Sequence, residues 1–253
     1  MRVVGIDPAP TKGLDTFDGG DRHVALHGSR AFIRSLCSDR DVLVCWDSPL
    51  TGPPDSTVAG GEGWGSAFSQ RSIESFFSKG GTGFKTPLGI SVRGYSGCPH
   101  WALSRALLGL PRVGPYDEND NKLPLRLLHT NTPPTTGLHV VEVHPAVAIW
   151  LWCRERRDPS ASWEYKKSAS VSDELWRLLM AVPDIADVLS TVSDQVPPSD
   201  DILDARVAFA LGRLWLDHPG SVALLGGADH GTFLLPEVSK MREAFAIFVA
   251  GSA

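Results

Sequence analysis

The sequence lacks the features that mark secreted, membrane-spanning or zinc-binding proteins. No pair of its four cysteines has the spacing of a zinc knuckle or of a CxxC redox motif, which indicates reduced and mostly buried thiols. No apolar run is long enough to span a bilayer, and the N-terminal stretch MRVVGIDP does not have the shape of a signal peptide. We therefore expect a cytoplasmic protein without a membrane partner.

A surplus of positive charge is also absent. The chain has 24 Lys and Arg residues against 29 Asp and Glu residues, a formal net charge of -5. This excludes a chain-wide electrostatic footprint for nucleic acid, but a local basic groove stays open because acids around a metal ion would make the total negative. The 253 residues, 42% of them hydrophobic, are ordinary for a globular protein, and we interpret 1–253 as one domain.

Apolar strands that end in a carboxylate are the main feature that is present. Residues 2–7 predict a first strand that ends at Asp7, and residues 41–47 predict another buried strand that ends at Asp47. Each acid is followed closely by proline, as expected where a strand turns at the carboxyl edge of a sheet. That edge is where α/β proteins bind ligands. A third apolar strand over 138–144 carries Glu142 between valines.

The remaining pattern predicts a hairpin and several helices around these strands. Residues 13–18 and 22–27 form the expected hairpin, and Ser29 is expected to cap a helix over 30–38. Ser199 is expected to cap a long helix that begins with Asp-Asp. Further elements are helices over 146–157, 172–181 and 184–193, strands over 221–225 and 233–235, and a last helix from Pro236.

Residues 51–137 differ from the rest by their many glycines. We interpret them as an insertion that lies over the sheet edge, since long irregular segments in compact domains are usually functional. The two helical segments expected within it are near 69–78 and over 99–108. Arg71 and Arg93 of this insertion, together with Lys166 after the third strand, are candidate contacts for substrate phosphates. The alternative is that these residues lie on a solvated surface or in ion pairs.

Asp201 and Asp204 are three residues apart on the long helix and therefore share one face. If that helix packs against the sheet, they can join Asp7, Asp47 and Glu142. Carboxylates that meet repel each other unless cations lie between them. Mg²⁺ or Mn²⁺ suits such oxygen ligands, and two ions about 4 Å apart can activate a water and stabilise a leaving oxygen.

The candidate site follows from this convergence. We expect Asp7, Asp47, Asp201 and Asp204 as metal ligands, and Glu142 as a further ligand or a group that positions water. Structural explanations compete for each residue. Asp7 and Asp47 can cap turns, and Asp201 can simply favour the first turn of its helix. Glu142 can belong to a buried ion pair. Core packing is the default for Trp150 and Trp152, and the histidines lack zinc spacing.

Four short motifs in this order resemble a known family. They are GIDPAP at 5–10, WDSPL at 46–50, VEVHPAVA at 141–148 and DDILDA at 200–205. Together they resemble the domain-of-unknown-function 429 (DUF429) family of predicted nucleases. The resemblance implies a ribonuclease H-like fold, with a mixed five-stranded sheet, flanking helices and the long Gly-rich insertion.

Carried onto this sequence, the resemblance implies that Asp7 and Asp47 are the strand acids and that Asp201 and Asp204 are the helical pair. The helical pattern is similar to the last motif of Holliday-junction resolvases, which usually have glutamate where this chain has Asp47. Glu142 matches the acid of the family's EV-P motif. We therefore expect a Mg²⁺- or Mn²⁺-dependent nuclease with nucleic acid as its partner.

Two alternatives remain open at this point. GIDPAPTKG and LLGGADHG resemble the phosphate loop and the adenosine-binding turn of sugar-kinase and actin-type phosphotransferases, although those enzymes need two copies of the fold. A non-catalytic binding module with the same fold is the second alternative.

Overall fold

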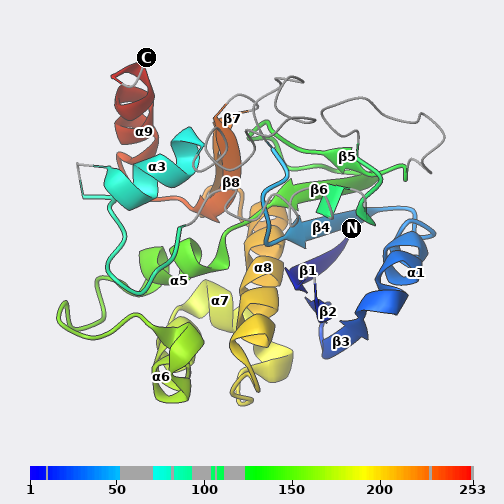
Figure 1. Ribbon diagram of the computed structural model, residues 1–253, viewed down its shortest axis with the longest axis horizontal. Coiled ribbons are helices and arrows are strands. Elements are labelled where there is room, and N and C mark those ends of the chain that lie inside the picture. The colour runs from blue at the N-terminus through cyan, green and yellow to red at the C-terminus, as the bar shows by residue number, and fades with distance from the viewer. Residues whose placement is uncertain are drawn as a thin grey trace.

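The structure is a computed structural model, and it describes most of the chain (Figure 1). The described residues are 1–9, 11–51, 71–80, 83–92, 104–105, 107–110, 123–227 and 230–251. Arg93, a predicted substrate contact, lies outside these ranges. Of the helix expected over 99–108, only 104–105 and 107–108 are described; 104, 105 and 107 are helical, and 108 is in a turn.

The centre of the fold is a mixed sheet of six strands in the order β3-β2-β1-β4-β6-β5. The strands are β1 Arg2–Ala9, β2 Gly13–Phe17, β3 Asp21–Ala25, β4 Val42–Trp46, β5 Arg126–Leu127 and β6 Leu138–Glu142. β2 is antiparallel to both of its neighbours, β1 and β3, whereas β4, β6 and β5 continue from β1 in parallel. The mixed α/β sheet is as predicted. The expected number of five strands is wrong, because β5 from segment 51–137 adds an edge strand.

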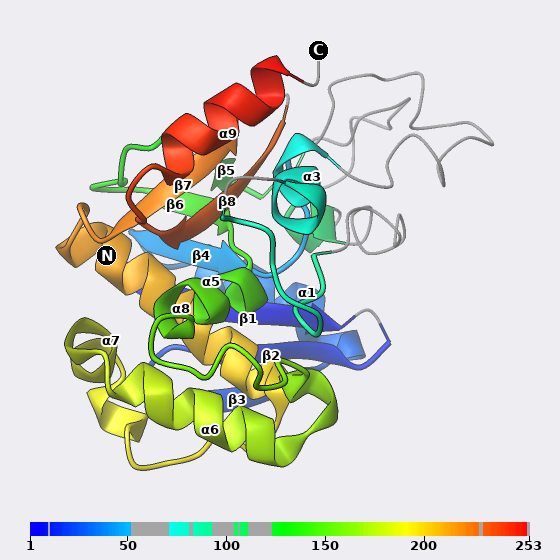
Figure 2. The ribbon, with the colours of Figure 1, turned by 90° about the vertical axis from the view of Figure 1, so that its left-hand side faces the viewer.

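Helices cover both faces of this sheet. The long helix α8 (Asp200–Asp217) crosses one face, and α1 (Leu26–Leu36) lies on the other, as the two ribbon views show together (Figure 2). Side chains alternate between the two faces: Val3 and Leu43 join the core under α8, while Val4 and Val44 join the core under α1. Burial on both faces explains why the strands read as continuous apolar runs.

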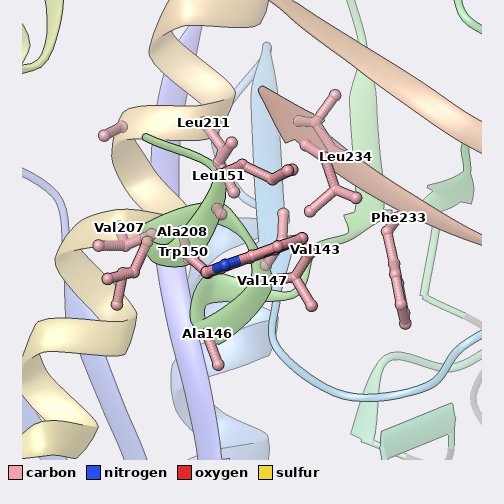
Figure 3. Close-up of a cluster of buried hydrophobic side chains, with 14 of the residues drawn as sticks. Val143, Ala146, Val147, Trp150, Leu151, Val207, Ala208, Leu211, Phe233 and Leu234 are labelled. Carbon is pink, nitrogen blue, oxygen red and sulfur yellow. The ribbon is translucent and has the colours of Figure 1, made fainter. Parts of the chain in front are cut away.

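A third group of elements packs beside α8. Helices α5 (Pro145–Cys153), α6 (Ala169–Met180) and α7 (Pro183–Val188) lie on the α8 side of the sheet. The hairpin of β7 (Val222–Gly227) and β8 (Gly231–Pro236) is linked to the end of β6 by a parallel bridge between Val143 and Leu234. Side chains from α5, α8 and β8 meet in one apolar cluster, in which Trp150 and Leu234 are buried (Figure 3).

The segment predicted as an insertion contributes helix α3 (Ser72–Lys79), which packs against the last helix, α9 (Met241–Ala250) (Figure 1). The Phe76 ring makes edge contacts with Phe245 at 5.4 Å and with Phe248 at 5.7 Å between centroids. The two segments are far apart in sequence, so this aromatic contact fixes the insertion to the C-terminal part of the chain.

Two helix starts differ from the prediction. Ser29 does not cap α1, which begins at Leu26 directly after β3; Ser29 is buried, and its hydroxyl donates to the Ala25 carbonyl at 3.3 Å. Pro236 ends β8, and α9 begins only at Met241. The predicted cap of α8 is confirmed, because the Ser199 hydroxyl accepts from the Ile202 N–H at 3.1 Å.

The prediction of one helix over 184–193 is also wrong: α7 ends at Val188, and a short 3₁₀ turn, η3 (Ser190–Val192), follows it. No helix in the described part of the chain has both the length and the apolar character that a membrane crossing requires.

Two glycines let α8 lie directly on the sheet. A Cβ at Gly5 would lie 2.0 Å from the Ala205 carbonyl oxygen and 2.4 Å from the Phe209 nitrogen. A Cβ at Gly212 would lie 2.3 Å from the Cys45 sulfur. The helix runs against the direction of β1, so its N-terminal end lies at the carboxyl edge of the sheet. This contact places Asp204, next to Ala205, beside the end of β1.

We expect Gly5→Ala to unfold the protein or to destabilise it by more than about 3 kcal/mol, because overpacking against backbone cannot relax by a side-chain rotation. Gly28→Ala is the matched control: it lies in α1, and its nearest contact would be Val24 at 3.6 Å. This substitution should stabilise the protein by up to about 1 kcal/mol. Urea unfolding followed by circular dichroism measures both. Equal stability of the two variants would contradict the close packing of α8.

Candidate metal centre

Asp7 and Asp47 lie at neighbouring positions on two parallel strands. Ile6 of β1 is in register with Trp46 of β4, and the Asp47 N–H donates to the Ile6 carbonyl at 2.9 Å. The two aspartates therefore follow the last paired row together. Because side chains alternate along a strand, both lie on the face that α8 covers, as Gly5 does.

Asp204 completes a group of three carboxylates. It projects from the second turn of α8, and one oxygen from each of Asp7, Asp47 and Asp204 lies within 4.8 Å of the other two. Asp204 is fully buried, whereas Asp7 and Asp47 retain partial exposure. Two strand ends and one helix, distant in sequence, thus bring carboxylates within the range of a shared cation.

The turn after α5 supplies both polar partners of Asp204. This is the 3₁₀ turn η2 (Tyr165–Lys167). The Tyr165 hydroxyl donates to Oδ1 of Asp204 at 2.7 Å, and the Lys166 Nζ lies 2.6 Å from Oδ2. Sequence reasoning selected Lys166 but gave no role to Tyr165. The only available signal was an aromatic residue next to a basic pair in a loop, which is too common to single out.

Burial disfavours the ionised forms of all three acids, and repulsion within the cluster adds to this effect at Asp7 and Asp47. Burial, followed by the charges of Asp47 and Asp204, raises the pKa of Asp7 well above its ordinary value. Burial, and then Asp204, raises the pKa of Asp47 to about 8. Burial raises the pKa of Asp204 despite the opposing effects of Lys166 and Tyr165. The cluster therefore requires positive charge before all three carboxylates can ionise.

The charge of Asp204 in turn acts on the η2 turn. It is the main cause that raises the pKa of Lys166, which keeps this amine protonated. Burial, followed by Asp204, raises the pKa of the Tyr165 hydroxyl well above its ordinary value, so the phenol remains a hydrogen-bond donor.

The donor set fits a hard divalent cation. All three groups offer carboxylate oxygens, which Mg²⁺ and Mn²⁺ prefer. Within the described residues, no hydrogen bond or ion pair engages the side-chain oxygens of Asp7 or Asp47. Partly exposed oxygens without a protein donor suit an ion that also keeps water ligands.

Asp201 lies one turn earlier on α8 and outside the group of three. Its Oδ2 is 3.4 Å from Nζ of the exposed Lys12. Its charge still contributes to raising the pKa of Asp7 and of Asp47. Asp201 is thus an acid at the rim of the cluster, close enough to act electrostatically.

Glu142 is part of a buried ion pair. It is in register with Trp46, one row before Asp47, so alternation turns it away from the face that carries Asp7 and Asp47. Its Oε2 accepts from the backbone N–H of Leu50 and of Thr51, and its Oε1 lies 2.5 Å from the Arg71 guanidinium. The structure therefore shows the buried ion pair that competed with metal binding as an explanation for Glu142.

Arg71 is the partner that neutralises this glutamate. Its side chain is 2% exposed and also pairs with Glu74, so the structure places it within the core and not at a surface where a phosphate could reach it. Its predicted role as a substrate contact is replaced by this structural one. Arg93, the other insertion residue predicted to bind substrate, lies outside the described residues.

Several other residues of interest have structural surroundings. Trp150 and Trp163 are buried, and Trp152 packs against the same core. His144 packs against Phe233, with centroids 4.9 Å apart. Burial, followed by the charges of Lys166 and Arg71, lowers the pKa of His144 to about 3, so the imidazole is neutral. The His230 ring lies 3.3 Å from the Ser72 hydroxyl.

Comparison with known proteins identifies a family over part of the chain. Residues 125–230 match the family model "Protein of unknown function (DUF429)", which confirms the DUF429 assignment there. This stretch contains Glu142, Lys166, Asp201 and Asp204, but neither Asp7 nor Asp47. A search of the curated proteins and a search of the solved structures each found no significant match.

Replacing Arg71 should be costly because two buried glutamates lose their cation. We expect Arg71→Met to destabilise the protein by about 3–5 kcal/mol in urea unfolding. Arg242→Met is the control, since Arg242 pairs with Glu237 while both side chains are partly exposed, and it should cost less than about 1 kcal/mol. A small and equal effect of both substitutions would contradict the structural role of Arg71.

The carboxylate cluster should give stability a distinctive pH dependence in EDTA. The folded protein raises the pKa of Asp47 to about 8, so it binds this proton more tightly than the unfolded chain does. The resulting stabilisation is complete below the unfolded pKa of about 4 and is lost as pH rises through about 8. Relative to Asp47→Asn, the wild type should therefore lose stability between about pH 4 and about pH 8.

Urea unfolding at several pH values tests this expectation, and Mn²⁺ should restore wild-type stability at high pH without helping Asp47→Asn equally. Parallel pH curves for the two proteins, with and without Mn²⁺, would show that the cluster is neither strained by charge nor relieved by a cation.

Proposed function

We propose that this protein is a Mg²⁺- or Mn²⁺-dependent nuclease that hydrolyses phosphodiester bonds of nucleic acid. The observation that carries the proposal is the meeting of Asp7, Asp47 and Asp204 within 4.8 Å of one another at the carboxyl edge of a sheet. Carboxylates that repel one another and are partly open to solvent are the arrangement that a divalent-metal site for phosphoryl chemistry requires.

The strand order supports the fold that this function would use. Strands β3-β2-β1-β4-β6 follow the arrangement of a ribonuclease H-like sheet, with three antiparallel strands followed by two parallel ones. Asp7 lies in the last part of β1, Asp47 directly follows β4, and the third acid comes from the helix laid across them. This agreement rests on topology and on the position of the acids, so it supports the proposal only by analogy.

Each residue has a defined task in this proposal. Asp7, Asp47 and Asp204 would hold the metal, which when bound supplies an activated water and stabilises the charge on the leaving oxygen. Tyr165 holds Asp204 in one orientation through its hydrogen bond at 2.7 Å. Lys166 brings a protonated amine to the same point and can contact a phosphate oxygen. Asp201 adds negative charge at the rim.

The phosphotransferase alternative receives less support from the same region. The ends of the LLGGADHG stretch form β7 and β8, which pair with each other. A Cβ at Gly231 would lie 2.7 Å from the Arg71 Nε, so this glycine packs against the buried ion pair. If the protein binds a metal ion but is inactive, the alternative of a binding module without turnover is favoured.

Cleavage assays test the proposal directly. Labelled single-stranded and duplex DNA, RNA and branched substrates are incubated with the protein in Mn²⁺, in Mg²⁺ and in EDTA. We expect cleavage only with a divalent ion, and a loss of at least about 100-fold in Asp7→Asn or Asp204→Asn, since a metal site contributes several kcal/mol to the barrier. Asp187→Asn, at an exposed position of α7, is the control and should keep full activity.

Melting temperatures distinguish the alternatives when no cleavage occurs. Stabilisation by Mn²⁺ without turnover would favour the binding module, and stabilisation by ATP would favour the phosphotransferase. If neither Mn²⁺ nor Mg²⁺ shifts the melting temperature and no substrate is cut, the nuclease proposal is refuted.

A further inference from the structure

A groove adjoins the carboxylate cluster on the side of the η2 turn. It has a volume of about 600 Å³ and lies between residues 85–91 of the insertion and the η2 turn. Tyr165 and Lys166 line it, and the same two residues contact Asp204. A ligand in this groove would therefore contact Tyr165 and Lys166, the two residues that also contact Asp204 of the cluster.

Defined contacts hold the insertion wall of the groove in place. The Thr86 N–H donates to the Phe77 carbonyl of α3 at 2.8 Å. Arg154 donates to the Gly83 carbonyl at 3.2 Å and lies over the Phe84 ring. Gly89 has a φ of +103°, and a Cβ there would lie 2.8 Å from the Trp163 carbonyl carbon, so the two walls touch at this glycine. The groove is thus built by packed segments of the chain.

The lining combines apolar surface with cations on both walls. Pro87, Ile90 and Ala146 provide apolar surface, and Leu88 is 93% exposed. Lys85 belongs to the insertion wall, whereas Lys166 and Lys167 belong to η2.

The three lysines differ in how far their charge is already neutralised. Lys166 pairs with Asp204, and Lys167 pairs with Glu164 at 2.7 Å, which also lines the groove. No carboxylate pairs with Lys85 among the described residues. Lys85 is therefore the lining cation whose charge is most available to an anionic ligand.

We infer that this groove binds unpaired nucleotides of a single-stranded nucleic acid and leads the strand to the carboxylate cluster. The choice of ligand rests on the proposed nuclease function. Sites for single strands combine cations for the backbone with side chains, usually aromatic, on which the base faces pack, and a paired duplex does not expose these faces. The volume is in the range of small-ligand pockets, so it suits one or a few nucleotides and not a double helix.

Equilibrium binding of fluorescein-labelled oligothymidylate tests this inference in EDTA, where no cleavage is expected. Fluorescence anisotropy is measured at several NaCl concentrations for wild type and for Lys85→Ala. If Lys85 contacts a phosphate, its loss should weaken binding and reduce the slope of log K against log salt by about 0.7. Arg30→Ala, an exposed position of α1 on the opposite face of the sheet, should leave both quantities unchanged.

Leu88→Ala separates apolar contact from charge. It should weaken binding by roughly three- to tenfold with the salt slope unchanged, since only apolar contact is lost. Three results would overturn the inference: no binding of the oligonucleotide, equal slopes for Lys85→Ala and wild type, or tighter binding of a duplex than of the single strand. These failures are distinct from failure of the nuclease proposal, because cleavage in Mn²⁺ depends on Asp7 and Asp204 whereas binding in EDTA depends on Lys85.

Discussion

The contact of α8 with β1 at Gly5 is the constraint on which the candidate site depends. A side chain at this position would overlap the helix backbone at Ala205 and Phe209, so the helix can reach the sheet only where the strand has no Cβ. Asp204 precedes Ala205, and Asp7 is two residues beyond Gly5. The glycine of the GIDP motif therefore has a physical role that is separate from the acid beside it: it sets the distance between a helix and a strand, and the position of two carboxylates follows from that distance.

Bringing these acids together has an electrostatic cost that the surrounding chain only partly offsets. Burial and repulsion raise the pKa of Asp7, Asp47 and Asp204, whereas Lys166 acts in the opposite direction on all three. Its side chain is 47% exposed, while Asp204 is fully buried, so the amine enters the cluster from the solvent side. A flexible amine can stabilise the acids and still move when another cation or a phosphate approaches. A fixed internal partner, such as Arg71 for Glu142, does not allow this.

Much of the scaffold could be predicted from local patterns, but several partners could not. The first strand, the strand before Asp47 and the Ser199 cap depend on short-range chemistry, and periodicity and capping rules detect them, although β1 continues past the predicted end at Asp7 to Ala9. Ser29 shows the limit of such rules, since a serine before an apolar stripe resembles a cap even when the helix starts earlier and buries it. The partners of Glu142 and Asp204 depend on segments distant in sequence, and nothing in one sequence links Arg71 to Glu142 or Lys166 to Asp204.

Glu142 shows how register can separate a structural acid from one at a candidate metal site. It belongs to the same strand-end pattern as Asp47, yet it lies one row earlier and therefore on the other face. There it accepts two backbone N–H groups from the loop after β4 and pairs with Arg71 at the start of α3. A buried carboxylate that is bonded in this way fixes where the insertion leaves the sheet after β4 and where α3 begins. The same ion pair also positions the insertion wall of the groove. Arg71 lies at the start of α3, and the Phe77 carbonyl of α3 accepts a hydrogen bond from the Thr86 N–H of that wall. Glu142 therefore influences the groove by positioning its wall, without contacting the metal ligands.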